Sequence, residues 1–574
     1  MTMKKYIFDN SNIAESYSGV TTPLTYSFAR YAYQEVYKHF CRMMGVGRRT
    51  INQHKEIFPR MVVFIGYRMY YDLINWYTLV SFLPGYKFNR EFFEKMLGVQ
   101  KDYNYSRDEK ISFFQKYFII LPRLLFQTLG ILFSFIFMGY LVRRFNKRFD
   151  RIFSRIGAIK LHDLDLRQLE GLYLRLHEDL TAQWRIPITN DFAVMVSAGM
   201  ADNLFRKWLD EPNVYSYLYF KSHNSLISLD PGLQILEIVT LIKDNLLILK
   251  IFEREQSPSS IFNILKIDFT NHCVTNAIFR YLEKFGSRTP NELKLETATL
   301  SEKPEVFIEL LKNLVNNRNV NNGDFTQKER NEPKKYNTLN TIKKIIIDFS
   351  LSWARKSIER REETRFRRAL IFGYARKIFL TMGQKLYQDR ILDSCNDIFY
   401  LTTDEISEFI RNGEMGAVLT DMACYRKKEF EYWQSVELPR RIETSTSIVE
   451  IEEEFKAKNR SRGTTIQPNI LKGVVASRPK INSIFGTVLV LPEFNPSVNF
   501  EGKILVTKQT DPGWTIVFPL LKGLIVERGG MLSHAAIVAR ELNIPCIVGV
   551  DNATTFIQDG SHIQMDLDKG EIHA

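Results

Sequence analysis

A single change in the spacing of apolar residues divides the 574-residue chain into two kinds of sequence. Up to about residue 455, apolar residues recur at three- and four-residue intervals, which predicts amphipathic helices. Long runs of this kind are Arg60–Leu83, Leu166–Trp184, Leu226–Phe252 and Asp348–Tyr387. From about residue 470, short apolar runs alternate with turn residues, which predicts strands. We therefore expect a multidomain fold: a large, mainly α-helical domain at 1–455 and a small α/β domain at 470–574.

Two polar stretches interrupt this pattern. Residues 316–337 are rich in asparagine and charge and nearly free of large apolar side chains, so we expect a mobile loop there. Residues 456–469 (KAKNRSRGTTIQPN) have a similar character and separate the two kinds of sequence. We interpret them as a linker that would reach on the order of 45 Å if fully extended at roughly 3.3 Å per residue.

The C-terminal region contains a regular series of strand and turn signals. A short helix is expected around Trp514–Leu521, with Asp511 as its N-cap. The turn Asp568-Lys569-Gly570 is expected to close a terminal hairpin. The predicted strands are Gly486–Leu491, Lys503–Lys508, Gly523–Glu527, Cys546–Val550 and His562–Asp566.

The stretch GLIVERGGMLSHAAIVAREL (523–542) is typical of a strand, a glycine turn and a helix. Ser533 stands at the N-cap position and His534 at the first helical position. The free amides and the dipole at a helix N-terminus favour an anion, and Gly529 and Gly530 allow the backbone to approach it closely. The same dipole disfavours an imidazolium, so we expect His534 to be a neutral nucleophile that becomes a phosphohistidine. A lone histidine at a helix start is also compatible with a structural or exposed position.

The longer stretch GGMLSHAAIVARELNIPCIVGV (529–550) resembles the phosphohistidine motif of the phosphoenolpyruvate-utilising enzymes, in which a swivelling domain carries the histidine. The resemblance places the phosphorylated histidine of the family on His534, the glycine pair on Gly529 and Gly530, and the usual threonine or serine on Ser533. The chain differs from the family at Ser287, because the family usually has a histidine there, within a G-H-R motif. Four further segments resemble one branch of this family, which includes rifampicin phosphotransferase and phosphoenolpyruvate synthase. They are TDPGWTIVF (510–518), SNIAESYSGVTTPLTYSF (11–28), FGSRTPNELKL (285–295) and NDIFYLTTDEI (396–406).

In that branch an ATP-grasp domain precedes the helical substrate domain and the phosphohistidine domain, and this chain resembles only the last two. The resemblance therefore implies a phosphotransferase component. A separate ATP-grasp nucleotide-binding protein, using ATP and Mg²⁺, would charge His534, and the helical domain would hold a small-molecule acceptor. Candidates for the acceptor site are Arg288 and Glu292, and Arg361 and Glu362. Each of the four is also compatible with a helix-surface or buried ion pair.

Charge and cysteine content narrow the partners and the location. The net charge of +13 attracts anions, but no recognition motif or basic-aromatic stripe accompanies it, so we expect no nucleic-acid partner. The five cysteines are far apart and form no C-x-x-C pair, which predicts no metal site and suits a reducing cytosol. No apolar segment typical of a signal peptide follows the N-terminal lysines, so we expect a cytoplasmic protein. The uncharged run at 124–142 fits either a fully buried helix or contact with a membrane.

Two further interpretations of function stay open at this point. The phosphoryl group could activate a hydroxyl or carboxylate for elimination or condensation in a biosynthetic reaction. The chain could instead be a non-catalytic binding or membrane-associated relative that has kept the fold. An intact GGMLSH motif disfavours the second of these alternatives.

Overall fold

The chain forms two compact units, each assembled from distant parts of the sequence. The first comprises Met1–Met195, Leu293–Glu296 and Leu370–Thr464, and the second comprises Val196–Glu292, Thr297–Ala369 and Thr465–Ala574. Two of the divisions fall inside helices α8 (Arg185–Leu204) and α14 (Thr341–Gln388), so the chain passes between the units there as a helix. The computed structural model describes residues 6–43, 46–82, 129–130, 133–210, 214–217, 230–255, 257–316, 335–413, 416–459, 470–479, 481–531 and 533–573.

The first unit contains a four-stranded antiparallel sheet in the order β2-β3-β1-β4. Its strands are β1 (Tyr6–Asp9), β2 (Val62–Ile65), β3 (Arg68–Asp72) and β4 (Arg441–Thr444). This sheet shows that the predicted helix over Arg60–Leu83 is wrong, because β2, β3 and helix α3 (Leu73–Ser81) occupy that range. Gly66 and Tyr67 join β2 to β3 with positive φ angles of 52° and 56°, as a two-residue type I′ turn requires.

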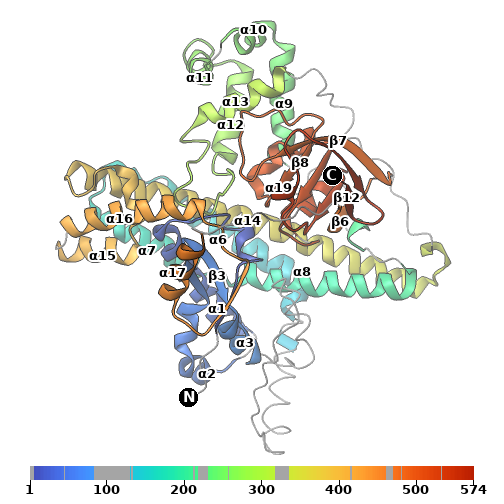
Figure 1. Cartoon of the computed structure of the whole chain (residues 1–574), viewed down its shortest axis with the longest axis horizontal. Helices are drawn as coiled ribbons and strands as arrows, with labels where there is room; N and C mark the ends of the chain where they lie inside the picture. Colours follow the sequence, from blue (N-terminus) through green and yellow to red (C-terminus); the bar gives the residue numbers. More distant parts are fainter. Residues whose placement is uncertain are drawn as a thin grey trace, which may run out of the picture. The chain divides into compact units, whose positions relative to one another are not determined.

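Helices make up most of the rest of the first unit (Figure 1). They are α1 (Pro23–Met43), α2 (Arg48–Gln53), α6 (Met138–Gly157), α7 (Leu166–Leu176), α15 (Thr403–Asn412), α16 (Gly416–Ser435) and α17 (Ile448–Asn459). The sequence fixes the ends of α15, because Thr402 and Glu405 form a capping box and Gly413 ends the helix with φ 69°. One apolar core joins α1, α7 and the C-terminal part of α14 through residues such as Phe28, Leu172 and Phe379.

The second unit contains a cluster of helices, drawn in green in Figure 1. They are α9 (Asp230–Asp244), α10 (Leu246–Arg254), α11 (Pro258–Ile267), α12 (Cys273–Phe285) and α13 (Pro304–Asn316). Helix α9 contacts α10, α12 and α13, and it also contacts the short 3₁₀ helix η10 (Pro512–Ile516) of the C-terminal region. This contact links the helical cluster to the segment upstream of the histidine motif.

The same unit contains an eight-stranded mixed sheet in the order β5-β12-β11-β7-β8-β9-β10-β6. Its strands are β5 (Ile470–Lys472), β6 (Val474–Ser477), β7 (Ser483–Val490), β8 (Ile504–Thr507), β9 (Gly523–Val526), β10 (Cys546–Val548), β11 (His562–Asp566) and β12 (Glu571–His573). Strands β7 to β10 are parallel, and every residue of β8 and β9 is buried, as is usual for parallel strands in the middle of a sheet. Helices α18 (His534–Glu541) and α19 (Ala553–Phe556) contact β10 and β8, respectively.

These elements confirm a largely helical chain with a small sheet-containing C-terminal domain. All five predicted strands are present within three residues of their expected ends, and β11 and β12 form the predicted terminal hairpin. The helix expected around Trp514–Leu521 consists of two 3₁₀ helices, η10 and η11 (Phe518–Leu520). Asp511 is the N-cap of η10 as expected, because its side chain accepts a hydrogen bond from the Gly513 amide at 2.9 Å.

Several predictions lie partly outside the described residues, among them the start of the predicted helical run at 226–252. Of the predicted loop at 316–337, the structure describes only 316 and 335–337. Of the predicted linker at 456–469, it describes only 456–459, which form the end of helix α17. Of the uncharged run at 124–142, 129–130 and 133–142 are described. Phe133 and Ile136 in that run are 61% and 69% exposed, so its described part is not the fully buried helix that one interpretation expected.

A helix that crosses a bilayer must be both long and apolar. None of the helices within the described ranges meets both requirements. Contact of the surface around Phe133 and Ile136 with a membrane therefore stays a prediction.

Candidate active site

Strand β9 ends at Val526, the glycine pair follows it, and helix α18 begins at His534. Gly529 has φ 121°, a backbone conformation that residues with side chains rarely adopt, which accounts for glycine at this position. A Cβ atom at Gly530 would meet nothing within 4 Å, so the turn is open on that side. Ser533 is the N-cap, with its Oγ accepting a hydrogen bond from the Ala536 amide at 3.4 Å. His534 is therefore the first residue of the helix, as predicted.

The imidazole of His534 is buried and held at one nitrogen. Only 6% of the residue is exposed, and its Nε2 lies 2.9 Å from Oγ1 of Thr515 on η10. Its Nδ1 has no hydrogen-bond partner among the described residues. Burial lowers the pKa of His534 to about 3; Glu362 opposes this shift, whereas Arg288 and Arg365 add to it. The ring is therefore neutral at neutral pH and keeps a nitrogen lone pair that can attack phosphorus.

Arg288 and Glu292 follow helix α12 and form a buried ion pair, with Nη1 of Arg288 3.5 Å from Oε1 of Glu292. The Arg288 guanidinium also lies over the ring of Phe366, 5.0 Å from its centroid. Neither its three nitrogens nor Oε2 of Glu292 has a hydrogen-bond partner among the described residues. Burial raises the pKa of Glu292 to about 7, although Arg288 lowers it. This carboxyl group can therefore take up or release a proton at neutral pH.

Helix α14 contributes Glu362, whose side chain is 1% exposed and whose Oε1 lies 3.3 Å from Nη1 of Arg365. Burial raises the pKa of Glu362, but the basic groups around it, Arg365 foremost, outweigh burial and hold the pKa below its ordinary value. Glu362 is therefore an anion at neutral pH, and its Oε2 has no hydrogen-bond partner in the part of the chain that the structure describes. Arg361 and Arg288 contribute to the same electrostatic balance.

The structure thus brings Arg288, Glu292 and Glu362 together with His534, from segments that are far apart in the sequence. Arg288 and Glu362 both affect the pKa of His534, and Glu362 affects that of Glu292, so these groups lie within electrostatic range of one another. Arg361 takes part through its effect on Glu362. The buried Arg288–Glu292 pair also agrees with the alternative interpretation of these residues as an ion pair.

Sequence reasoning missed two residues of this site. Arg365 was not among the candidates, although it stands three residues after Glu362 on α14 and pairs with that buried carboxylate. Thr515 could have been found from its segment, since TDPGWTIVF had been recognised as similar to the family without a role for its threonine. Thr515 is 1% exposed, so its buried hydroxyl requires a polar partner, and His534 is that partner.

Buried polar atoms without hydrogen-bond partners are rare in folded proteins, and several of them gather at this site. They belong to Arg288, Glu292, Glu362 and His534. Guanidinium N–H groups match phosphoryl oxygens, and carboxylates match the hydroxyl of an acceptor. The arrangement is therefore suited to a ligand that has both an anionic and a hydroxyl group.

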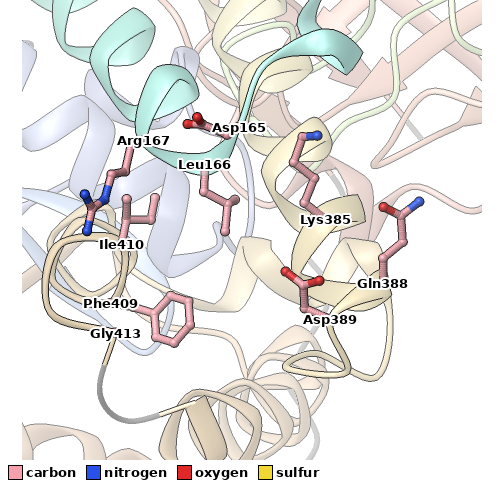
Figure 2. A pocket seen from close by; sticks show the side chains of 9 residues that line it. All are labelled: Asp165, Leu166, Arg167, Lys385, Gln388, Asp389, Phe409, Ile410 and Gly413. Atoms are coloured by element: carbon pink, nitrogen blue, oxygen red, sulfur yellow. The ribbon is translucent and has the colours of Figure 1, made fainter.

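A pocket of about 480 Å³ lies in the first unit and contains none of the predicted site residues. Figure 2 shows Arg167 and Lys385 on opposite sides of it. The residues that line it are Asp165, Leu166, Arg167, Lys385, Gln388, Asp389, Phe409, Ile410 and Gly413. Its mixture of acidic and basic groups selects no single ligand charge.

Among the described residues, a group of potential metal ligands lies on the terminal hairpin, at Asp566, Glu571 and His573. Glu571 already pairs with Lys472 at 2.9 Å, and Asp566 accepts hydrogen bonds from the amides that follow it. These interactions use the carboxylates, and the absence of a metal site stays a prediction.

Comparison with known families agrees with this geometry. The model described as "PEP-utilising enzyme, mobile domain" matches residues 498–570, which include the glycine turn and His534. The model described as "rifampicin phosphotransferase fourth domain" matches residues 188–362, which include Arg288, Glu292 and Glu362. The chain is therefore similar to PEP-utilising enzymes in the region of the histidine and to rifampicin phosphotransferase in part of its helical region.

Curated relatives resemble the chain over part of its length. The chain is 26% identical to the rifampicin phosphotransferase of Bacillus subtilis over 70% of its own length and 46% of the relative. It is 24% identical to the rifampicin phosphotransferase of Bacillus cereus, over 69% of its own length and 46% of the relative. A probable phosphoenolpyruvate synthase of Staphylothermus marinus is 35% identical over 23% of this chain and 16% of the relative. These similarities are mainly to rifampicin phosphotransferases, and the chain spans less than half the length of those that it matches.

Proposed function

We propose that this chain is the phosphoryl-carrying and acceptor-binding component of a phosphotransferase. A separate ATP-grasp protein, with ATP and Mg²⁺, charges His534, and the residues around Arg288 hold a small-molecule acceptor. The observation that carries this proposal is a buried, neutral His534 at a helix N-terminus within electrostatic range of Arg288, Arg365 and Glu362. Similarity to phosphotransferases of the same family supports it.

In the charging step, a lone pair on the His534 ring attacks phosphorus in the nucleotide. A nitrogen–phosphorus bond forms as the bond between phosphorus and the leaving oxygen breaks. The dipole at the start of α18 favours the negative charge that the phosphoryl group brings, and the open side of Gly530 leaves space beside it. Ser533 and Gly529 keep the turn and the helix start in this geometry.

In the delivery step, a hydroxyl oxygen of the acceptor attacks phosphorus and the bond to the His534 nitrogen breaks. Arg288, Arg361 and Arg365 offset the charge on the transferring oxygens, which is the main catalytic contribution in phosphoryl transfer. The hydroxyl proton passes to Glu292, whose pKa of about 7 suits this task. Ser287 stands where the family usually has a histidine, so Glu292 is the group of this segment that can accept a proton.

The proposal also includes where the reaction takes place and what becomes of the phosphoryl group on the acceptor. We place the reaction in the cytoplasm and expect no nucleic-acid partner. Biosynthetic elimination or condensation would use the same charged histidine and would differ only in the product. Analysis of whether the acceptor keeps or loses the phosphoryl group distinguishes these outcomes.

The decisive experiment is transfer of label from ATP to the chain in the presence of a candidate ATP-grasp protein. We expect acid-labile label on the wild-type chain and none on the His534→Ala variant. Rifampicin is the first acceptor to test, because the curated relatives are named for it. Label that persists in His534→Ala would exclude His534 as the carrier.

A further inference from the structure

The short helix η10 touches both sides of the candidate site. Asp511, at its N-terminus, accepts hydrogen bonds from the amide of Gly513 in its own segment and from the amide of Asn291. Asn291 has φ 61° and belongs to the same segment as Arg288 and Glu292. One carboxylate therefore connects the C-terminal domain to the backbone that carries the proposed acceptor residues.

The contact next to Asp511 leaves no room for a side chain. A Cβ atom at Gly513 would lie well inside 3.0 Å of the backbone of Thr289 and Pro290, a separation that real Cβ atoms essentially never show. Only glycine allows these two backbone segments to meet in this way. The contact is fitted at the level of the backbone and does not depend on a flexible side chain.

The same helix holds the histidine. Thr515 lies two residues after Gly513, and its hydroxyl contacts Nε2 of His534 at 2.9 Å. Asp511 and Gly513 therefore bind the acceptor segment, while Thr515 binds the carrier residue. With both contacts in place, His534 is 6% exposed and lies within electrostatic range of Arg288 and Glu362.

We propose that Asp511–Thr515 is the docking element that seats the C-terminal domain against residues 288–292 for phosphoryl delivery. The inference rests on the proposed function, in which His534 must also visit a charging site. Leaving the docked position breaks the contacts of Asp511 and Gly513 with residues 289–291. The Thr515–His534 contact travels with the domain, because both residues belong to it.

The variant Gly513→Ala tests this docking. The three atoms nearest to a methyl group there all belong to residues 289–290, so the substitution acts directly against docking. We expect the rate at which diethylpyrocarbonate modifies His534 to rise by about tenfold, because opening exposes the ring. Amide hydrogen exchange at 289–292 should accelerate in parallel. Gly171→Ala is the matched control, since a Cβ at Gly171 in α7 meets nothing within 4 Å.

A second variant, Asp511→Asn, tests the same docking in case Gly513→Ala does not fold. Asp511→Asn keeps an N-cap oxygen but weakens the bond to the Asn291 amide, so it should shift both readouts in the same direction by a smaller factor. If His534 reactivity and exchange at 289–292 stay at wild-type values in both variants, the docking role is wrong. These readouts need no phosphoryl transfer, so a failure of docking is distinguishable from a failure of His534 to accept label from ATP.

Discussion

At the scale of single residues, burial acts in opposite senses on the two titratable groups that the proposed reaction uses. It lowers the pKa of His534 to about 3 and raises that of Glu292 to about 7. A neutral imidazole serves as nucleophile over the whole physiological pH range, whereas Glu292 changes protonation within it. The pH dependence of delivery should therefore come from Glu292 and not from His534.

Replacing Glu292 by glutamine tests this division of roles. The base must be ionised to accept the hydroxyl proton, so wild-type delivery should become faster as pH rises through about 7. Glu292→Gln should lower the delivery rate by about 10²-fold and remove this rise with pH. The measurement is the loss of label from phosphorylated His534 to whichever acceptor the labelling assay identifies. Glu283→Gln, on the exposed face of α12, is the matched control, and an unchanged pH profile in Glu292→Gln would contradict the assignment.

At the scale of elements, the sequence was most informative where a local signal alone determines the structure. Ser533 is the helix N-cap that its position predicted, and the terminal turn closes the expected hairpin. The β2–β3 hairpin was missed because its signal is short. Gly66 and Tyr67 form the turn, and a Cβ at Gly66 would lie within 3.0 Å of Trp433 and Leu438, a constraint that no local pattern contains.

In the candidate site, too, the sequence revealed the residues with a local signal and not those whose roles depend on distant segments. His534 was found because its turn and helix are contiguous in the sequence. Thr515 and Arg365 were missed because their roles depend on packing between segments that lie far apart along the chain. The pairing of β1 with β4, from opposite ends of the first unit's sequence, was missed for that reason as well.

The two glycines of the histidine turn should respond differently to substitution. Gly529 has φ 121°, so Gly529→Ala should destabilise the C-terminal domain by about 1–3 kcal/mol. Gly530 has open space around its Cβ position and no positive φ, so Gly530→Ala should change stability by about 0.5 kcal/mol or less. Urea unfolding of the two variants and the wild type measures the difference. Equal losses in both variants would show that backbone strain does not explain the conformation at Gly529.

At the scale of the whole molecule, one unit contains both partners of the proposed delivery step. The second unit combines the segment that carries Arg288 and Glu292, the part of α14 that carries Glu362, and the C-terminal sheet with His534. Delivery therefore needs only contacts within that unit. Charging by a separate protein instead requires the C-terminal domain to leave them, so the connection at 456–469 should limit how far it travels.

Shortening that connection tests whether the domain must move. Helix α17 ends at Asn459 and strand β5 begins at Ile470, which leaves the ten residues 460–469 between them. Deleting five of them would cut the maximum span by roughly 17 Å, at about 3.3 Å per residue. We expect the charging of His534 by the ATP-grasp protein to fall at least about tenfold, because the domain no longer reaches the charging site. A Gly/Ser segment of the original length is the matched control and should keep charging near the wild-type rate, since only reach is needed. Full charging in the shortened chain would mean that His534 is phosphorylated without a swing of its domain.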